Sequence, residues 1–189
     1  MKYLALTVLT LLIACAAFAG GNPGVATYVD FDPPNRLHYV TPAQYTAVLA
    51  YICFGDLTMG LAGCSFMVTD VGVECPGVFA PDPGFTNLLP GDLAIGNYLT
   101  GITLASTECM PGPDVCVAYV SLFYLGGECC IEVLDHPDYP RWVLDCNDPA
   151  QVDFYGILAG GGGAVNTASP CPTVPVEEST WGSVKALYR

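Results

Sequence analysis

The amino-acid sequence predicts an all-β fold, a two-sheet antiparallel β-sandwich stapled by disulfide bonds. The 21 glycines and 16 prolines are spread along the chain and bound short runs rich in Val, Tyr, Phe, Thr and Leu, as expected of short strands joined by turns. The body of the chain shows no long segment with the apolar period of an amphipathic helix. A hydrophobic content of 52% is enough for a folded core. A β-barrel is the alternative arrangement of such strands.

The strands predicted in the first half are short, rich in β-branched and aromatic residues, and end at Gly, Pro or Asp. They cover residues 25–31, 37–40, 44–54 and 61–68. In the last of them, period-two alternation places Cys64, Phe66 and Val68 on one face. Together these strands look like the opening of a sandwich.

Residues 74–97 are dominated by Pro, Gly, Asp and Asn and are predicted to form a long connection with a short strand near residues 93–95. Further strands are predicted at residues 98–106, 115–125, 130–134, 142–145 and 151–158. Gly126-Gly127 forms a turn that makes 130–134 the expected hairpin partner of 115–125. A flexible glycine run, residues 160–163, ends the domain.

The N-terminus has the features of a secretory signal. Lys2 supplies the positive charge, residues 4–13 form an apolar run, and Ala17-Phe18-Ala19 offers a cleavage site. Leu12-Ile13-Ala14-Cys15 gives a second interpretation, a lipobox whose Cys15 carries a lipid anchor. Either way we expect a bacterial protein that is secreted or held at the cell surface, with no transmembrane helix in the mature chain.

The chain is acidic, with a formal net charge of −13. This charge disfavours nucleic acid and anionic membranes as partners. The simpler interpretation is that acidity keeps a hydrophobic exported protein in solution; the other is that some carboxylates bind Ca²⁺. The calcium candidates are Asp145, Asn147, Asp148 and Asp153. Because the segment lacks the glycine and terminal glutamate of a calcium loop, a turn cap is the favoured interpretation, and we predict no cofactor.

Nine cysteines remain after cleavage at Ala19, and in an oxidising compartment they are expected to form disulfides. The absence of C-x-x-C spacing and the presence of only two histidines disfavour zinc. The candidates for pairing are Cys53, Cys64, Cys75, Cys109, Cys116, Cys129, Cys130 and Cys146.

The spacing of these cysteines suggests several pairings without fixing them. Cys109 and Cys116 flank a Pro-Gly turn and are the first pair we predict. Cys53 and Cys64 also flank a turn. Adjacent Cys129 and Cys130 point to opposite strand faces and need different partners, one of them Cys146. The odd count leaves Cys171 as the predicted free or intermolecular thiol.

Residues 43–69 carry a resemblance to a known family. A long strand ending in Phe54, a glycine-rich turn and Gly60-Leu61-Ala62-Gly63-Cys64-Ser65-Phe66 resemble the early strands of cohesin-type sandwiches, where G-[IL]-x-G-x-x-F is familiar. Gly101-Ile102-Thr103 and the strands of 115–134 follow in compatible order. The resemblance covers about 110 residues and implies a cohesin- or immunoglobulin-like sandwich that binds or scaffolds other proteins.

The C-terminus carries a second resemblance. Residues 179–189, Ser-Thr-Trp-Gly-Ser-Val-Lys-Ala-Leu-Tyr-Arg, resemble the S-T-W-G-x-[IV]-K-x-[LM]-[YF]-R ending of many uncharacterised secreted bacterial proteins. Residues 135–143 also resemble segments of such proteins. The likeness implies a shared sorting or docking role for the tail.

The composition of the tail indicates a spacer followed by a short helix. Pro170, Pro172 and Pro175 stiffen the spacer. The predicted docking residues follow at helical spacing: Trp181, Val184, Leu187 and the adjacent Tyr188. Lys185 and Arg189 oppose the acidic body. The tail either packs on its own domain or is recognised by another protein.

The sequence offers no catalytic motif. His136 lies near Asp135 and Asp138, but no nucleophile context accompanies it. Tyr139 and Trp142 could form a platform for sugar rings, although Trp142 is more often a core residue in this setting.

These observations predict a non-enzymatic extracellular domain that binds proteins or assembles with its own copies through its edges and tail. A carbohydrate-binding module is the alternative, and a secreted hydrolase a distant third. The predicted divisions are a signal at 1–19, the sandwich at 20–163, and a linker with docking or sorting segment at 164–189.

Overall fold

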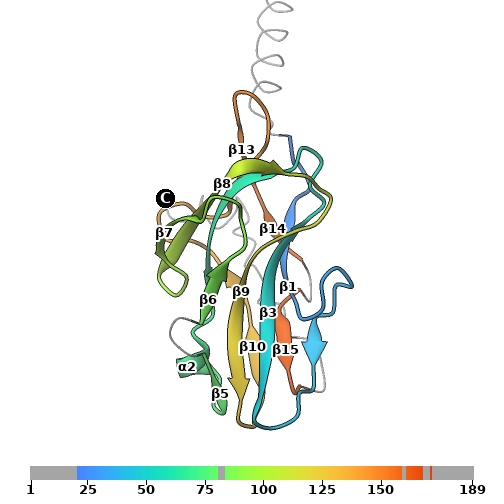
Figure 1. Cartoon of the computed structure of the whole chain (residues 1–189), viewed down its shortest axis with the longest axis vertical. Coiled ribbons are helices and arrows are strands. Elements are labelled where there is room, and N and C mark those ends of the chain that lie inside the picture. Colours follow the sequence, from blue (N-terminus) through green and yellow to red (C-terminus); the bar gives the residue numbers. More distant parts are fainter. Residues whose placement is uncertain (1–20, 81–83, 159–160, 168–170, 172–189) are drawn as a thin grey trace, which may run out of the picture.

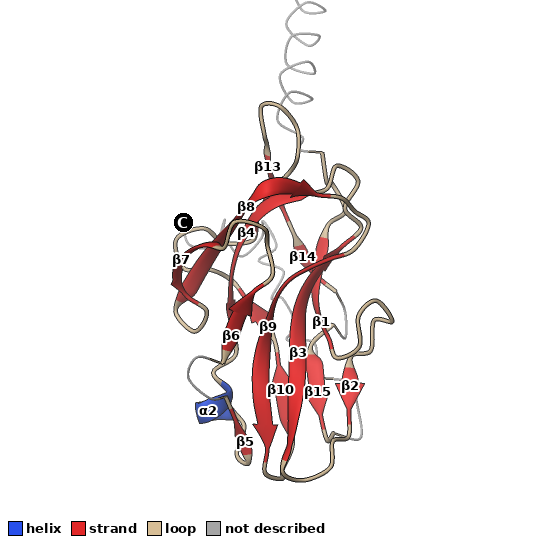
Figure 2. Ribbon diagram, in the orientation of Figure 1, coloured by secondary structure: helices blue, strands red, loops and turns tan. Residues whose placement is uncertain are grey.

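The structure is a computed structural model of the chain and describes residues 21–80, 84–158, 161–167 and 171. The predicted signal, Cys15 and the docking residues Trp181, Val184, Leu187 and Tyr188 lie outside these residues. The described part is a β-sandwich, which confirms the predicted fold class (Figure 1). Strands make up its regular structure apart from the single turn of helix α2 (Val71–Glu74), drawn in blue in Figure 2. No helix in this part is long and apolar enough to span a membrane.

One layer is built around two long strands that run side by side through the molecule (Figure 1). Its strand order is β14-β1-β3-β9-β5, and β6 also pairs with β9. The strands are β1 (Ala26–Asp30), β3 (Thr46–Gly55), β5 (Val78–Phe79), β6 (Phe85–Asn87), β9 (Val115–Tyr124) and β14 (Gly156–Ile157). Most neighbours are antiparallel, whereas β14 runs parallel to β1.

The facing sheet has the order β13-β12-β4-β8-β7, and β11 pairs with the far end of β4. Its strands are β4 (Leu61–Val68), β7 (Leu93–Asn97), β8 (Gly101–Met110), β11 (Val133–Leu134), β12 (Trp142–Leu144) and β13 (Val152–Phe154). The strand predicted at residues 93–95 is β7, which pairs with β8 along its whole length. Both edge strands, β13 and β7, are short, which limits edge-to-edge aggregation.

A third, small sheet joins β10 (Cys129–Ile131), β15 (Gly163–Val165) and β2 (Tyr39–Val40). It corrects two predictions. The strand that begins after Gly126-Gly127 pairs with β15 and not with β9, because β3, β5 and β6 already occupy the edges of β9. The boundary after residue 163 is too early, since Ala164 and Val165 lie in β15 and are buried.

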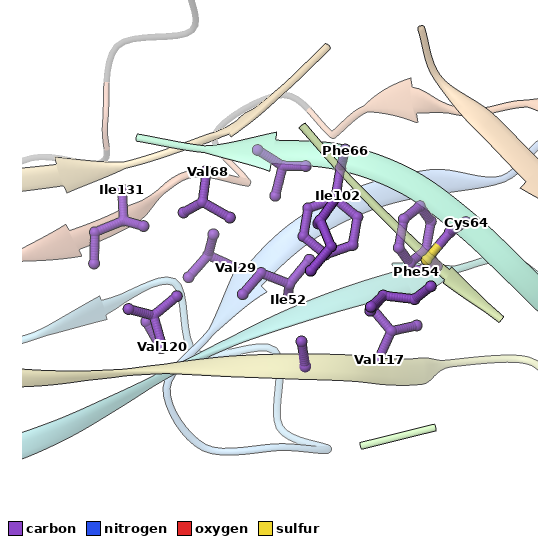
Figure 3. Packing of buried hydrophobic residues seen from close by; sticks show 14 of the residues in the cluster. Val29, Ile52, Phe54, Cys64, Phe66, Val68, Ile102, Val117, Val120 and Ile131 are labelled. Atoms are coloured by element: carbon purple, nitrogen blue, oxygen red, sulfur yellow. The ribbon is translucent and has the colours of Figure 1, made fainter. Parts of the chain in front are cut away.

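The core lies between the layers, as Figure 3 shows. Ile52 and Phe54 on β3 and Val117 and Val120 on β9 face residues of the opposite layer, and each is at most 1% exposed. The predicted apolar face of β4 is confirmed, because Cys64, Phe66 and Val68 all belong to the buried cluster. The ring of Phe54 packs edge-on against the ring of Tyr155, with 5.2 Å between the ring centroids.

Four disulfides staple the fold, and their pairing differs from the prediction. They join Cys53 to Cys116, Cys75 to Cys129, Cys109 to Cys146, and Cys130 to Cys171. The prediction that Cys171 is unpaired is wrong; the one free cysteine of the described residues is Cys64, buried in the core. Proximity across turns misled the prediction, since Cys53 and Cys116 meet across the β3–β9 ladder from 63 residues apart.

Candidate functional site

The strand register assembles an uncharged surface on the outer face of the sheet that contains β4. Cys64 and Leu104 point into the core, so their neighbours on either side point outward. Two rows of outward residues cross all five strands. The first row is Phe154, Trp142, Ser65, Thr103 and Ile95, and the second is Val152, Leu144, Gly63, Ala105 and Leu93. We call these ten residues the apolar face.

Residue size varies systematically across the apolar face. The central strands β4 and β8 contribute Gly63, Ser65, Thr103 and Ala105, while the outer strands contribute large side chains. At the edges, Phe154 is 67% exposed and Ile95 is 78% exposed. Three strand spacings separate β12 from β7, about 14 Å. On β4 the small residues between these edges are covered: Gly63 and Ser65 are buried, and Ser65 Oγ lies 2.7 Å from the carbonyl oxygen of Tyr139.

The apolar face carries no ionisable side chain, although the chain has a net charge of −13. The nearest charge pair is beside it, where Arg141 Nε lies 2.8 Å from Asp135 Oδ1. The hydrogen bond to Asp135 raises the pKa of Arg141, so the guanidinium stays charged and paired. The exposed residues of the face, which lie on the outer strands β13, β12 and β7, are all apolar, and exposed apolar residues gathered on one face are typical of an interaction surface.

Three exposed aromatic rings gather at the β13 edge. The rings of Tyr139 and Trp142 lie 4.9 Å apart, and Trp142 is directly opposite Phe154 in the register. Trp142 is 38% exposed, which corrects its interpretation as a core residue: its neighbour Val143 supplies the buried side chain of β12. The structure thus brings together the two platform residues that the sequence singled out and adds Phe154 to them.

The loop that carries Tyr139 is fixed by polar contacts. His136 is nearly buried, and its Nδ1 accepts hydrogen bonds from the backbone N–H groups of Asp138 and Tyr139, both at 3.1 Å. Ser65 Oγ donates to the carbonyl of Tyr139 at 2.7 Å. His136 therefore caps a turn, and its acceptor nitrogen is occupied by the backbone.

Tyr155 anchors the same region from the core side. Its hydroxyl donates to the carbonyl of Ser65 at 3.0 Å, and burial raises the pKa of the phenol. The backbone N–H of Tyr155 donates to the carbonyl of Arg141 at 3.0 Å. These bonds tie the end of β13 to the loop before β12 and to β4, so the aromatic edge is held rigidly.

A buried polar network positions the other end of the β12–β13 hairpin. Asp145 is fully buried, and its two carboxylate oxygens accept hydrogen bonds from the backbone N–H groups of Gly21, Asn147 and Gln151 and from the side-chain amide of Asn147. Burial raises the pKa of Asp145, but these donors outweigh it and hold the pKa below its usual value. The turn after β12 is thereby closed around one carboxylate.

Asn22 extends this network to the β3–β4 turn. Its amide oxygen accepts from the N–H groups of Thr58 and Met59, both at 2.8 Å, and its amide nitrogen donates to the carbonyl of Gly60. Its own backbone N–H donates to Asp153 Oδ2 at 2.8 Å. Burial, with the nearby charge of Asp145, raises the pKa of Asp153.

The calcium candidates Asp145, Asn147, Asp148 and Asp153 do not form a metal site in the described residues, where no group of three His, Cys, Asp or Glu side chains is placed to hold an ion. The carboxylates of Asp145 and Asp153 face N–H donors instead. Asp145 caps the turn, in keeping with the favoured interpretation of the sequence.

The sequence reasoning missed part of the apolar face. Phe154, Leu93 and Ile95 were not singled out, although each sits at an alternate position of a short strand. The signal was present in Leu93-Ala94-Ile95 and Val152-Asp153-Phe154, where the larger apolar residues alternate with a small or acidic one. It was not usable, because the orientation of such strands is fixed only by their neighbours.

Two solved structures are similar to this chain in strand layout. One is the seventh ScaB type I cohesin from Pseudobacteroides cellulosolvens, with 12% sequence identity and a TM-score of 0.46, covering 79% of this chain and 96% of that one. The other is a chain of the CaDoc0917–CaCohA2 complex, with 12% identity and a TM-score of 0.43, covering 75% and 97%. No model of a protein family and no curated protein matches. Likenesses of this size assign neither a family nor a function to the chain.

Proposed function

We propose that this chain is a non-enzymatic interaction domain that works outside the cytoplasm and binds an apolar segment of a protein partner on the apolar face. The observation that carries the proposal is the composition of that face: its exposed residues on β13, β12 and β7 are all apolar, and none of its ten residues is ionisable, on a strongly acidic chain. Apolar protein surfaces recognise one another by burying such areas.

Three further features support an interaction domain. Four disulfides within one small domain fit an oxidising compartment. His136 was the one histidine weighed as a catalytic residue, and its Nδ1 accepts hydrogen bonds from two backbone N–H groups. The rigid anchoring of the aromatic edge also suits binding, because a preorganised surface loses little conformational entropy when a partner docks.

Site-specific photo-crosslinking tests this proposal. A benzophenone amino acid at Phe154 or Ile95 in the full chain, irradiated in the producing organism, is expected to give one discrete covalent adduct with a partner protein. The matched control is Val73 on α2, which is as exposed as Ile95 but lies away from the apolar face. Equal adducts from all three positions, or none from Phe154 and Ile95, would show that the face does not bind a partner.

A carbohydrate-binding role is the second candidate, favoured by the contact between the exposed rings of Tyr139 and Trp142. Stacking on a sugar ring needs such a platform together with polar groups, which Asp135 and Arg141 supply nearby. If this role holds, retention on a glycan column is lost in Trp142→Ala and in Tyr139→Ala, and Phe123→Ala on the opposite sheet leaves it unchanged. A column that retains none of the four proteins, on a broad panel of glycans, rules this role out.

A further inference from the structure

The aromatic edge, made of Tyr139, Trp142 and Phe154, leaves part of every ring open to solvent. The exposed fractions of the three side chains are 44%, 38% and 67%. The ring centroids of Tyr139 and Trp142 lie 4.9 Å apart at an interplanar angle of 45°, and Phe154 is opposite Trp142 in the register. The face of an aromatic ring carries partial negative charge, so such rings attract a cation placed over them.

The formal charge around these rings is negative. Arg141 is the only lysine or arginine in residues 135–154, and its charge is already engaged, because its Nε lies 2.8 Å from Asp135 Oδ1. His136 adds no positive charge, since its Nδ1 accepts two backbone N–H groups and an accepting ring nitrogen carries no proton. Five aspartates against this one arginine give the segment a net charge of −4: Asp135, Asp138, Asp145, Asp148 and Asp153.

Two of these carboxylates lie behind the exposed surface of the β12–β13 hairpin. Asp153 is buried between the outward residues Val152 and Phe154 on β13, and Asp145 is fully buried in the turn after β12. Their partners are N–H donors, and no basic side chain of the described residues forms an ion pair with either. Because buried charges are screened less than exposed ones, both add to the negative potential at the aromatic edge.

Asp138 adds an exposed carboxylate at the edge itself. It directly precedes Tyr139 in the loop before β12, and its side chain is exposed. An acidic residue of a partner would meet like charge here, whereas a basic one meets aromatic rings and uncancelled carboxylates together.

We propose that the aromatic edge binds a lysine or arginine side chain of the protein partner, so that the segment recognised by the apolar face carries a basic residue beside its apolar ones. This inference rests on the proposed function, because it specifies the chemistry of the partner at the same face. The cation lies over the rings of Tyr139 and Trp142, and its apolar neighbours lie along the rest of the face.

Trp142 provides the readout, because the chain has only one other tryptophan, Trp181. In the full-length mature protein carrying Trp181→Phe, Trp142 emission is followed during addition of acetyl-Leu-Val-Lys-Val-Leu-amide or the same peptide with glutamine in place of lysine. The lysine peptide is expected to bind about fivefold more tightly. This preference should shrink at about 1 M salt, where the Debye length is about 3 Å.

Two matched pairs of variants locate the effect. Asp138→Asn is expected to reduce the preference for lysine, whereas Glu74→Gln on α2, which removes the same charge from an exposed position away from the face, should leave it unchanged. Tyr139→Leu is expected to reduce the preference, and Tyr139→Phe, which keeps a ring, should retain it.

Equal affinities for the two peptides, or no response to the lysine peptide, overturn the proposal. Equal reductions in Asp138→Asn and Glu74→Gln also overturn it, because the preference would then reflect net charge alone. Emission that responds to a panel of soluble oligosaccharides but to neither peptide overturns it in favour of the sugar platform. The photo-crosslinking experiment does not depend on the charge of the segment. A discrete adduct without a lysine preference therefore removes this inference and leaves the proposed function standing.

Discussion

Replacement of Asp145 by Asn is expected to lower the free energy of unfolding by about 3 kcal/mol, the cost of leaving buried donors unpaired. The substitution keeps the shape of the side chain but turns one acceptor oxygen into a donor. Whichever way the amide is oriented, it faces N–H donors, because both oxygens of Asp145 accept them now. Urea unfolding of the mature protein, followed by far-UV circular dichroism, measures the loss.

Asp153→Asn is the matched control. The one backbone donor to this carboxylate, the N–H of Asn22, can be satisfied by the amide oxygen of Asn. Because burial raises the pKa of Asp153, removing its charge also relieves a cost at neutral pH, so little loss is expected. Equal losses in the two variants would contradict the assignment of Asp145 as the organising acceptor.

The lowered pKa of Asp145 also fixes the direction of its pH effect. A carboxyl whose pKa is lower in the folded state stabilises the fold above its unfolded pKa of about 3.9, and the contribution is lost as the pH falls through the folded value. The difference in stability between the wild type and Asp145→Asn should therefore shrink on acidification. A difference that stays constant in acid would show that the charge of Asp145 is not involved.

Removal of the Cys109–Cys146 disulfide, by serine at both positions, is expected to cost up to about 4 kcal/mol in the chain-entropy relation for a loop of 37 residues. The bond joins the end of β8 to the turn after β12, two strands of the apolar face. Thermal unfolding of the non-reduced mature protein measures the effect, which should appear as a lower melting temperature.

Cys64→Ala provides the comparison for this disulfide. Cys64 has no disulfide partner, so its replacement should cost only about 1 kcal/mol of lost packing. After denaturation without reductant, one thiol of the mature chain cleaved after Ala19 should react in the wild type and none in Cys64→Ala. A reactive thiol that persists in Cys64→Ala would mean that the disulfides pair differently.

On the apolar face, the local sequence pattern predicts which residue types are present but not which of them are exposed. Tyr139 and Trp142 were recognisable as aromatic residues of a loop and a short strand, but their exposure depends on the position of β12 between β4 and β13. Phe154 lies in the strand predicted at 151–158, but the sequence assigns it no role. Its place at the aromatic edge follows only from the register, which sets it opposite Trp142.

The disulfide pairing likewise depends on contacts between distant segments, which the local sequence pattern does not predict. The sequence correctly indicated that adjacent Cys129 and Cys130 take different partners, since neighbouring strand residues face opposite ways. It could not supply the partners, because Cys75 and Cys171 approach from segments 54 and 41 residues away. Spacing along the chain favours short loops, whereas sheet pairing brings distant segments together.

The sequence by itself determined the fold class and the inward side of β4, because period-two alternation and turn residues are local properties that survive any order of strands. Only the tertiary structure decided that Cys64 stays unpaired and that Ser65, on the opposite side of the same strand, is buried against the carbonyl of Tyr139. The reason is that alternation tells which residues share a face of one strand, while the neighbours across that face depend on long-range pairing.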